Sequence, residues 1–254
     1  MGTARVSGKP APLVRAFVDG IDEVVREPSS GQGLSAIQRG WLAFCLTAIL
    51  VTNSICWARF ERASLGAYSL AAVSWMFRHA KMPWEQLLVA SVRMLLRPYG
   101  LTSGSLVLDD TDNQRSKAAK TIAHLSKLRD QESGGYIWGQ SLVFLLLITP
   151  TISIPVGFAF YQPAPELSAW YKQERRLKEQ GVPTKQRPPK PPANPQYPTT
   201  QELAVRLVQQ CKDQHSALSV HCVVADALYG TSTFVDAASA IFDGRQVITQ
   251  VRSN

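Results

Sequence analysis

Two short aliphatic runs that end in aspartate constrain the fold of this chain more than any other feature. The first is LVLDDT at residues 106–111, and the second is CVVADALYG at residues 222–230. Each run is apolar and partly β-branched, which is typical of a buried strand. Open sheets carry binding and catalytic groups at strand ends, where rigid strands fix the side chains and loops leave space for a ligand. The two runs therefore predict an α/β sheet with paired carboxylates at one edge.

The composition indicates a globular, basic protein. Of the 254 residues, 45% are hydrophobic and 18% are charged, a balance typical of a folded core. The net charge of +8 favours a polyanionic partner, either nucleic acid or an anionic membrane surface. The four cysteines are scattered without a C-x-x-C pair. We therefore expect reduced, buried thiols rather than a zinc or redox site.

Two apolar segments come close to the length of a membrane span. Residues 41–57 contain several hydroxyl and amide side chains, and we interpret them as a buried helix. Residues 141–161 are interrupted by Pro150 and Pro155, which favours two strands joined by a turn. Residues 1–14 lack the apolar core of a signal peptide. We expect a cytoplasmic protein without membrane contacts, and a multi-span membrane protein is the less favoured alternative.

The pattern of the chain changes near residue 103. Residues 13–97 show helical spacing without strand-like alternation, which predicts an α-helical N-terminal region over residues 1–103. Residues 104–254 show three strands and then a helix, a strand, a helix and a strand. Strands with short connections pair antiparallel and helix-linked strands pair parallel, so we predict a mixed sheet flanked by helices. The fourth strand would insert beside the first.

A basic, proline-rich insertion occupies residues 163–198 of this second region. Its lysines and arginines are interleaved with aromatic residues and prolines. One interpretation is an arm that grips phosphates through sequence-independent contacts. The other, equally favoured, is a solvated linker that its prolines keep extended.

Three segments of the second region resemble the core of DDE-type insertion-sequence transposases. They are Asp109-Asp110-Thr111, GYIWGQS at residues 135–141, and ADALYG at residues 225–230. The resemblance implies a ribonuclease H-like fold over residues 104–254, in which Asp, Asp and Glu hold two divalent ions, Mg²⁺ or Mn²⁺. The family's Asp-x-Thr pattern selects Asp109, although Asp110 stays open as the ligand. The implied catalytic and metal-binding residues are Asp109 and Asp226, with no other cofactor.

Paired carboxylates suit such chemistry for a physical reason that is independent of the resemblance. Mg²⁺ prefers oxygen ligands and retains waters and substrate phosphate oxygens. Two metal ions about 3.5–4 Å apart can serve both the attacking and the leaving oxygen of an in-line displacement. The competing interpretation is that the two aspartates are ordinary turn or helix caps in an unrelated α/β domain.

The resemblance stops before the family's third carboxylate. That glutamate belongs to a later helix, in a Tyr-x-x-Arg-x-x-x-Glu-x-x-x-x-x-x-Lys context, whereas no glutamate follows Glu202 here. Asp236 and Asp243 are candidates only by default, and we expect both at the surface. The chain is thus expected to be C-terminally truncated before the catalytic Glu and inactive alone. It would be a transposase chain that cleaves and joins DNA when complete, or a catalytically dead DNA-binding remnant or regulator.

The implied partner is double-stranded DNA at transposon ends, in a bacterial cytoplasm and associated with the nucleoid. A homodimer is implied as well, because two ends must be cut, and no small-molecule substrate is expected. The predicted DNA contacts lie after the first aspartate and in the insertion: Lys117, Lys120, Lys127, Arg129, Arg175, Arg176, Lys185 and Arg187.

Overall fold

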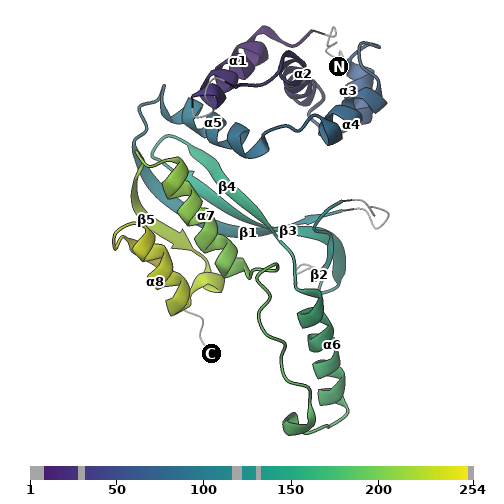
Figure 1. Ribbon diagram of the computed structural model, residues 1–254, viewed down its shortest axis with the longest axis vertical. Helices are drawn as coiled ribbons and strands as arrows, with labels where there is room; N and C mark the ends of the chain where they lie inside the picture. The colour runs from purple at the N-terminus through teal and green to yellow at the C-terminus, as the bar shows by residue number, and fades with distance from the viewer. Residues whose placement is uncertain (1–8, 28–31, 116–121, 130–132, 251–254) are drawn as a thin grey trace. The chain divides into compact units, whose positions relative to one another are not determined.

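The structure, a computed structural model, describes residues 9–27, 32–115, 122–129 and 133–250. The chain divides into two compact units, residues 1–101 and residues 102–254, and each is described by itself (Figure 1). The predicted division lay between residues 103 and 104. That the two units are separate domains stays a prediction.

The first unit is a set of helices, as the sequence predicts. Their bounds are α1 Pro12–Arg26, α2 Ala36–Thr52, α3 Trp57–Ala63, α4 Leu70–His79 and α5 Trp84–Leu96. Helix α2 begins with a capping box in which Ser35 and Gln38 satisfy each other's backbone N–H groups, and it ends at Asn53 in the left-handed conformation. Its aromatic residues pack with Phe60 and Val73 into the buried core of this unit.

Helix α2 carries part of the apolar segment that resembles a membrane span. In the described part of the chain, no single helix is long and apolar enough to cross a membrane. Helices α2 and α3 are together long and apolar enough for a membrane span, but a bend of 90° lies between them. Much of α2 is buried in the core of the helical unit, as predicted. The prediction of one helix over residues 41–57 is wrong in extent, because α2 ends at Thr52, where Asn53 takes the left-handed conformation, and α3 begins only at Trp57.

The second unit is built on a six-stranded mixed sheet. The strands are β1 Ser103–Gln114, β2 Ser126–Arg129, β3 Tyr136–Ile148, β4 Ser153–Tyr161, β5 Ser219–Ala225 and β6 Gln246–Thr249. Strand β3 pairs antiparallel with β1, β2 and β4, whereas β5 pairs parallel with both β1 and β6. The strand order is β2-β3-β1-β5-β6 with β4 on β3, so the predicted fold class and the insertion of the fourth predicted strand beside the first are confirmed.

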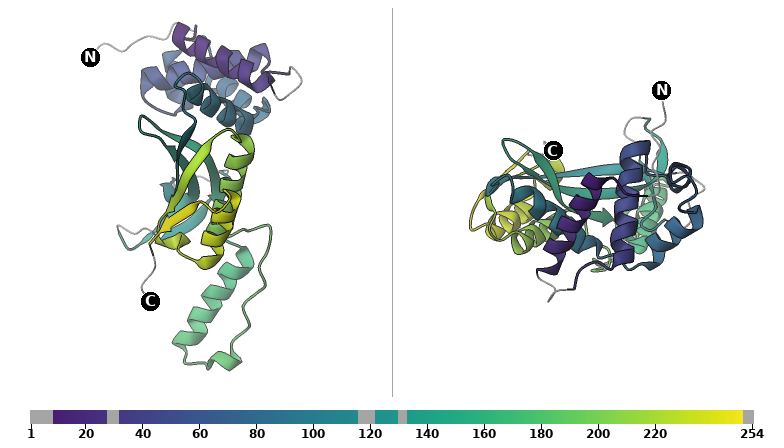
Figure 2. Two further views of the ribbon diagram at one scale, coloured as in Figure 1. Left: turned by 90° about the vertical axis from the view of Figure 1, so that its left-hand side faces the viewer. Right: turned by 90° about the horizontal axis from the view of Figure 1, so that it is seen from above.

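Two helices cover one face of this sheet. Helix α7 (Thr200–Gln214) packs on β3 and β4, and α8 (Ser232–Ile241) packs on α7 and β6 (Figures 1 and 2). Helix α7 begins at Thr199, whose hydroxyl accepts the N–H of Glu202 in a second capping box. Its buried face includes Leu207, which lies over Gly157 of β4. This helix layer covers one face of the sheet.

The structure corrects the predicted strands in two places. Strand β1 does not end at Asp109, because its antiparallel pairing with β3 continues to Gln114 opposite Gly139. Only the parallel pairing with β5 stops near that point, at Leu108 opposite Ala225. Strand β2 was not predicted at all, since its four residues are too short to show an alternating pattern.

The structure also corrects the interpretation of residues 163–198 as an extended linker. Residues Pro165–Glu179 form helix α6, and Thr184–Gln186 form a short 3₁₀ turn, η1. Proline stands at the first helical position of α6, where its missing N–H costs nothing. Pro163 precedes α6, and the remaining prolines lie in the segment that returns to α7. Figure 1 and the left view of Figure 2 show α6 and this segment extending away from the sheet.

Candidate metal centre

The two predicted aspartates lie at the same level of neighbouring central strands. The last residues that β1 and β5 pair in parallel are Leu108 and Ala225, and the next residue of each strand is an aspartate, Asp109 or Asp226. Residues 117 positions apart in the chain are therefore brought together by strand register. Asp110 and Asp112 follow on β1, and we call Asp109, Asp110, Asp112 and Asp226 the acidic cluster.

Each of the two predicted ligands uses one carboxylate oxygen locally. Asp226 accepts the N–H of Leu228 at 2.7 Å and so caps a short 3₁₀ turn, η2 (Ala227–Tyr229). Asp109 accepts the N–H of Asp110 at 2.9 Å. Among the described residues, nothing donates to the second oxygen of either carboxylate. Asp226 is thus a cap, as the competing interpretation proposed, and it retains an oxygen that can bind a cation.

The charges of the acidic cluster act on one another. Partial burial raises the pKa of Asp110, and the negative charges of Asp226, Asp109 and Asp112 raise it further. Carboxylates that repel one another in this way favour a nearby positive charge. A divalent cation would relieve the repulsion, so the electrostatics of this sheet end suit a bound metal ion.

Tyr229 adds a buried polar group beside the cluster. Its side chain is fully buried, its ring packs on Phe234 at 5.3 Å between centroids, and its hydroxyl has no hydrogen-bond partner among the described residues. Burial, and then the charges of Asp110, Asp226 and Asp109, raise the pKa of this phenol. Sequence reasoning missed this hydroxyl, because its burial depends on packing with α8.

Gly230 completes the ADALYG motif for a steric reason. A Cβ atom at this position would lie 2.5 Å from the carbonyl oxygen of Gln250, which follows β6. Only glycine lets the loop after Asp226 pass this backbone. The motif thus combines a carboxylate, a buried phenol and a close backbone approach within five residues.

The donor set fits the oxygen chemistry of Mg²⁺ or Mn²⁺, which bind carboxylates and retain waters. It is incomplete, however, since no group of three or more His, Cys, Asp or Glu side chains in the described residues is placed to hold a metal ion. Asp236 is exposed on α8, and Asp243 is 90% exposed and pairs with Lys212 at 3.6 Å. Neither default candidate therefore joins the cluster.

The predicted DNA contacts after the first aspartate are only partly described. Lys117 and Lys120 lie outside the described residues. Lys127 and Arg129 project from the exposed side of β2, opposite the exposed aromatic residues Trp138 and Tyr136 of β3. The Lys127 ammonium group lies 4.4 Å from the centre of the Tyr136 ring.

The predicted contacts in the insertion divide into two kinds. Arg175, Arg176 and Lys185 are exposed. Arg187 is instead largely buried: its guanidinium donates to Glu174 at 2.7 Å and to the carbonyl of Val182 at 2.8 Å. Its side chain is therefore engaged in the fold of the insertion.

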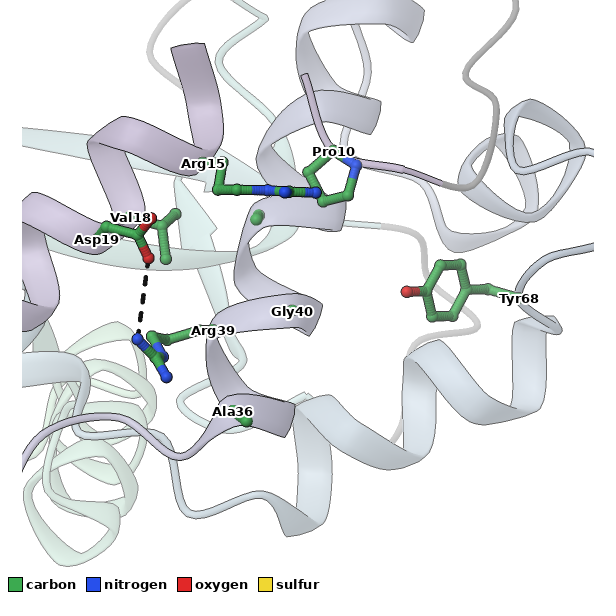
Figure 3. A pocket seen from close by; sticks show the side chains of 9 residues that line it. Pro10, Arg15, Val18, Asp19, Ala36, Arg39, Gly40 and Tyr68 are labelled. Atoms are coloured by element: carbon green, nitrogen blue, oxygen red, sulfur yellow. Dashed lines mark ion pairs between the residues drawn. The ribbon is translucent and has the colours of Figure 1, made fainter. Parts of the chain in front are cut away.

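The helical unit contains a separate cavity of about 360 Å³ (Figure 3). The cavity is lined by Pro10, Arg15, Val18, Asp19, Ala36, Arg39, Gly40, Ala43 and Tyr68. Arg39 lies 3.9 Å from Asp19, the ion pair drawn in Figure 3, and 3.5 Å from the buried Asp22. These carboxylates offset the charge of Arg39, and the predicted catalytic aspartates all lie in the other unit.

Comparison with known proteins identifies the family. The family model for DDE superfamily endonucleases matches residues 69–254, well over half of the chain. No curated protein matches the chain. The match begins at Ser69, the N-cap of α4, and covers the entire sheet with the acidic cluster. The six-stranded mixed sheet flanked by helices is the ribonuclease H-like fold that the resemblance implied. The chain belongs to the DDE superfamily endonucleases.

Proposed function

We propose that this chain is an insertion-sequence transposase chain that binds double-stranded DNA at transposon ends and holds divalent metal through Asp109 and Asp226. The observation that supports this most is the parallel register of β1 and β5, whose last pair, Leu108 and Ala225, directly precedes these two aspartates. Membership of an endonuclease family supports DNA as the substrate and metal-dependent phosphodiester cleavage as the reaction.

In this proposal the residues of the chain have distinct roles. The free oxygens of Asp109 and Asp226 bind Mg²⁺ or Mn²⁺, while the capping bonds to Leu228 and Asp110 fix both side chains. The bound metal supplies an activated nucleophile and stabilises the leaving oxygen. Asp110 adds negative charge beside them, and Lys127 and Arg129 bind DNA phosphates from β2.

The proposal has two forms, and both concern the third carboxylate of the metal site. Because the described residues place no third ligand at the cluster, we propose that the chain shown here supplies two of three ligands and does not cleave DNA alone. The same observation favours the alternative, a DNA-binding remnant that regulates an intact enzyme by forming mixed dimers. Both forms predict DNA binding and a metal site at the same two aspartates.

Calorimetric titration with Mn²⁺ tests the metal site. We expect the wild-type chain to bind Mn²⁺ and Asp109→Asn and Asp226→Asn each to weaken binding at least tenfold. Asp243→Asn is the matched control, since it removes an exposed carboxylate outside the acidic cluster. Equal affinity of wild type and Asp226→Asn would refute the assignment.

Incubation with supercoiled plasmid tests the proposal that this chain binds DNA but does not cleave it alone. We expect DNA binding that weakens with salt and no nicked product with Mg²⁺ or Mn²⁺. Metal-dependent nicking that disappears in Asp226→Asn would instead show that the chain is a complete enzyme. The absence of any DNA binding would contradict both forms.

A further inference from the structure

The insertion at residues 163–198, which we call the arm, is a folded element. The indole N–H of Trp170 on α6 donates to the carbonyl of Pro188 on the returning segment at 2.9 Å. Arg187 binds Glu174 and the carbonyl of Val182, with its side chain only 15% exposed. These contacts join the helix to the returning segment along one side, so the arm holds its shape.

The opposite side of α6 carries three cations and one carboxylate, that of Glu179. The side of α6 that faces the returning segment carries Trp170, Glu174 and Leu177. The three cations of the opposite side follow the i, i+3, i+4 spacing of one helix face and are Lys172, Arg175 and Arg176. All three of these cations are exposed, and none forms an ion pair with any described residue. We call Lys172, Arg175 and Arg176 the basic ridge.

The arm carries a large share of the net positive charge of the chain. Residues 163–198 contain seven basic and three acidic residues, a net charge of +4 against +8 for the chain. About one seventh of the length thus carries half of the net charge. Such a concentration on a preformed helix matches the regular negative charge of a nucleic-acid backbone.

The chain enters the arm at the end of the sheet that carries the acidic cluster. Tyr161, the last residue of β4, pairs with Ser141 of β3, and Ser141 pairs with Asp112 of β1. The chain therefore leaves the sheet for α6 at the level of the acidic cluster. The arm begins two strands away from β1.

The chain leaves the arm at the start of α7, which is hydrogen-bonded to the loop that follows Asp226. Gln201, in the first turn of α7, donates to the carbonyl of Leu228 at 2.8 Å and accepts from the hydroxyl of Thr231 at 3.1 Å. Leu228 is also the residue whose N–H is bound by Asp226. Both ends of the arm thus lie at the end of the sheet that carries the acidic cluster.

We infer that the arm is a clamp for double-stranded DNA, whose basic ridge binds backbone phosphates without reading sequence and holds the duplex beside the acidic cluster. This inference rests on the proposed function, because it takes DNA as the substrate. The 15 residues of α6 span about 22 Å, roughly two thirds of the 34 Å of one turn of B-DNA. Because the arm is already folded, binding orders few new groups.

The test uses the full chain and a 30-base-pair duplex, with fluorescence anisotropy in EDTA over a series of salt concentrations. The triple variant Lys172→Gln, Arg175→Gln, Arg176→Gln should flatten the slope of log affinity against log salt by about 2–3, near 0.9 for each lost phosphate contact. At 100 mM salt we expect at least tenfold weaker binding. Duplexes of unrelated sequence should show the same loss.

The matched control removes the same charge elsewhere. Arg59→Gln, Arg78→Gln and Lys81→Gln alter three exposed cations of the helical unit and should change affinity by less than twofold. Equal losses in both triple variants would attribute binding to net charge and overturn the inference. Unchanged far-ultraviolet circular dichroism and melting temperature would verify that the ridge variant folds.

A second pair of variants tests whether the folded shape of the arm matters. Arg187→Gln and Arg175→Gln each remove one charge, but only Arg187 joins α6 to the returning segment. We expect Arg187→Gln to weaken DNA binding at least threefold more and to speed trypsin cleavage within residues 163–198. Equal effects of the two variants on affinity and cleavage would overturn the preformed clamp.

The remaining outcomes distinguish this inference from the proposed function. If the wild-type chain binds no duplex at all, the proposed function fails together with the clamp. If it binds and the ridge variant keeps the same affinity and salt slope, only the clamp is overturned. Ridge-dependent binding to phosphatidylserine vesicles, without ridge-dependent binding to duplex, would assign the arm to a membrane surface and overturn the clamp as well.

Discussion

At the residue scale, the surroundings of each cysteine set its reactivity. Burial raises the pKa of Cys45 and of Cys211 to about 12. Cys56 precedes α3, and the backbone N–H groups of Arg59 and Ala58 lower its pKa, as expected for a thiol at a helix N-terminus. The composition predicted four buried thiols, whereas Cys56 and Cys222 are only partly buried.

The first prediction is therefore that iodoacetamide at pH 7.5 modifies Cys56 before Cys45 and Cys211, because the thiolate is the reactive form and Cys56 forms it more readily than these two buried thiols. Peptide mass spectrometry over a time course measures the order. Cys56→Ser should remove the fast phase. Modification of Cys211 at the same rate as Cys56 in the native chain would contradict the described burial.

The second prediction concerns Tyr229, whose buried hydroxyl has no partner among the described residues. Tyr229→Phe should leave the melting temperature unchanged or raise it, since an unpaired buried hydroxyl costs about 1–3 kcal/mol. Thermal denaturation without divalent metal measures this. Phe234→Ala, which removes the ring that Tyr229 packs on, should lower stability by about 3–5 kcal/mol. A marked loss in Tyr229→Phe would reveal a hydrogen bond.

The sequence predicted Asp109 and Asp226, since an aliphatic run that ends in aspartate is visible without a structure. It did not predict the raised pKa of Asp110 or the burial of Tyr229. Those properties depend on the register of β1 against β5, which joins residues more than a hundred positions apart. Local pattern carries no information about such pairing.

At the element scale, the capping box of α7 gives a third prediction. Hydrogen bonds from the backbone N–H and then the hydroxyl of Thr199 lower the pKa of Glu202 from its ordinary 4.5. A lowered folded pKa means that the charge stabilises the fold above about pH 4.5 and that this contribution is lost as pH falls further.

Glu202→Gln should therefore lower the free energy of unfolding by about 0.5 kcal/mol at pH 7, a small value because the carboxylate is exposed. The difference from wild type should disappear near pH 3. Thr199→Ala, which removes the cap itself, should cost about 1 kcal/mol at both pH values. Urea denaturation measures each. A Glu202→Gln difference that grows towards acid would contradict this sign.

The fourth prediction compares two glycines. Gly230→Ala should destabilise the fold by about 1–3 kcal/mol, because the new Cβ would lie 2.5 Å from the backbone oxygen of Gln250. Gly40→Ala in α2 meets no atom within 4 Å and should stabilise by about 0.5–1 kcal/mol. Denaturant titration of both variants measures the contrast. Equal effects would show that the loop after Asp226 is not tightly held.

The elements were predictable where periodicity extends over a full element. Strands β3 and β4 and helices α7 and α8 occur in the predicted order along the chain. Helix α6 was not predicted, because its many charged residues leave only a short apolar stripe. The nearby prolines indicated an extended chain instead. The contacts of Trp170 and Arg187 with the returning segment supply the stabilisation that composition does not reveal.

At the scale of the whole molecule, the change of sequence pattern near residue 103 and the boundary between the two compact units at residue 101 fall almost together. The family match nevertheless begins at Ser69 and includes α4 and α5 of the helical unit. The sequence predicted the mixed sheet and its central pair of strands. The shape of the arm required the structure.

The most direct measurement of the central claim is backbone cleavage by bound iron. Fe²⁺ replaces Mg²⁺ at an oxygen-rich site, and with ascorbate and peroxide it generates radicals that cut the nearest backbone. The account predicts two cuts, near Asp109 and near Asp226, which excess Mg²⁺ suppresses and Asp226→Asn abolishes. Cuts elsewhere, or the same cuts in Asp226→Asn, would contradict a metal site built from these two strands.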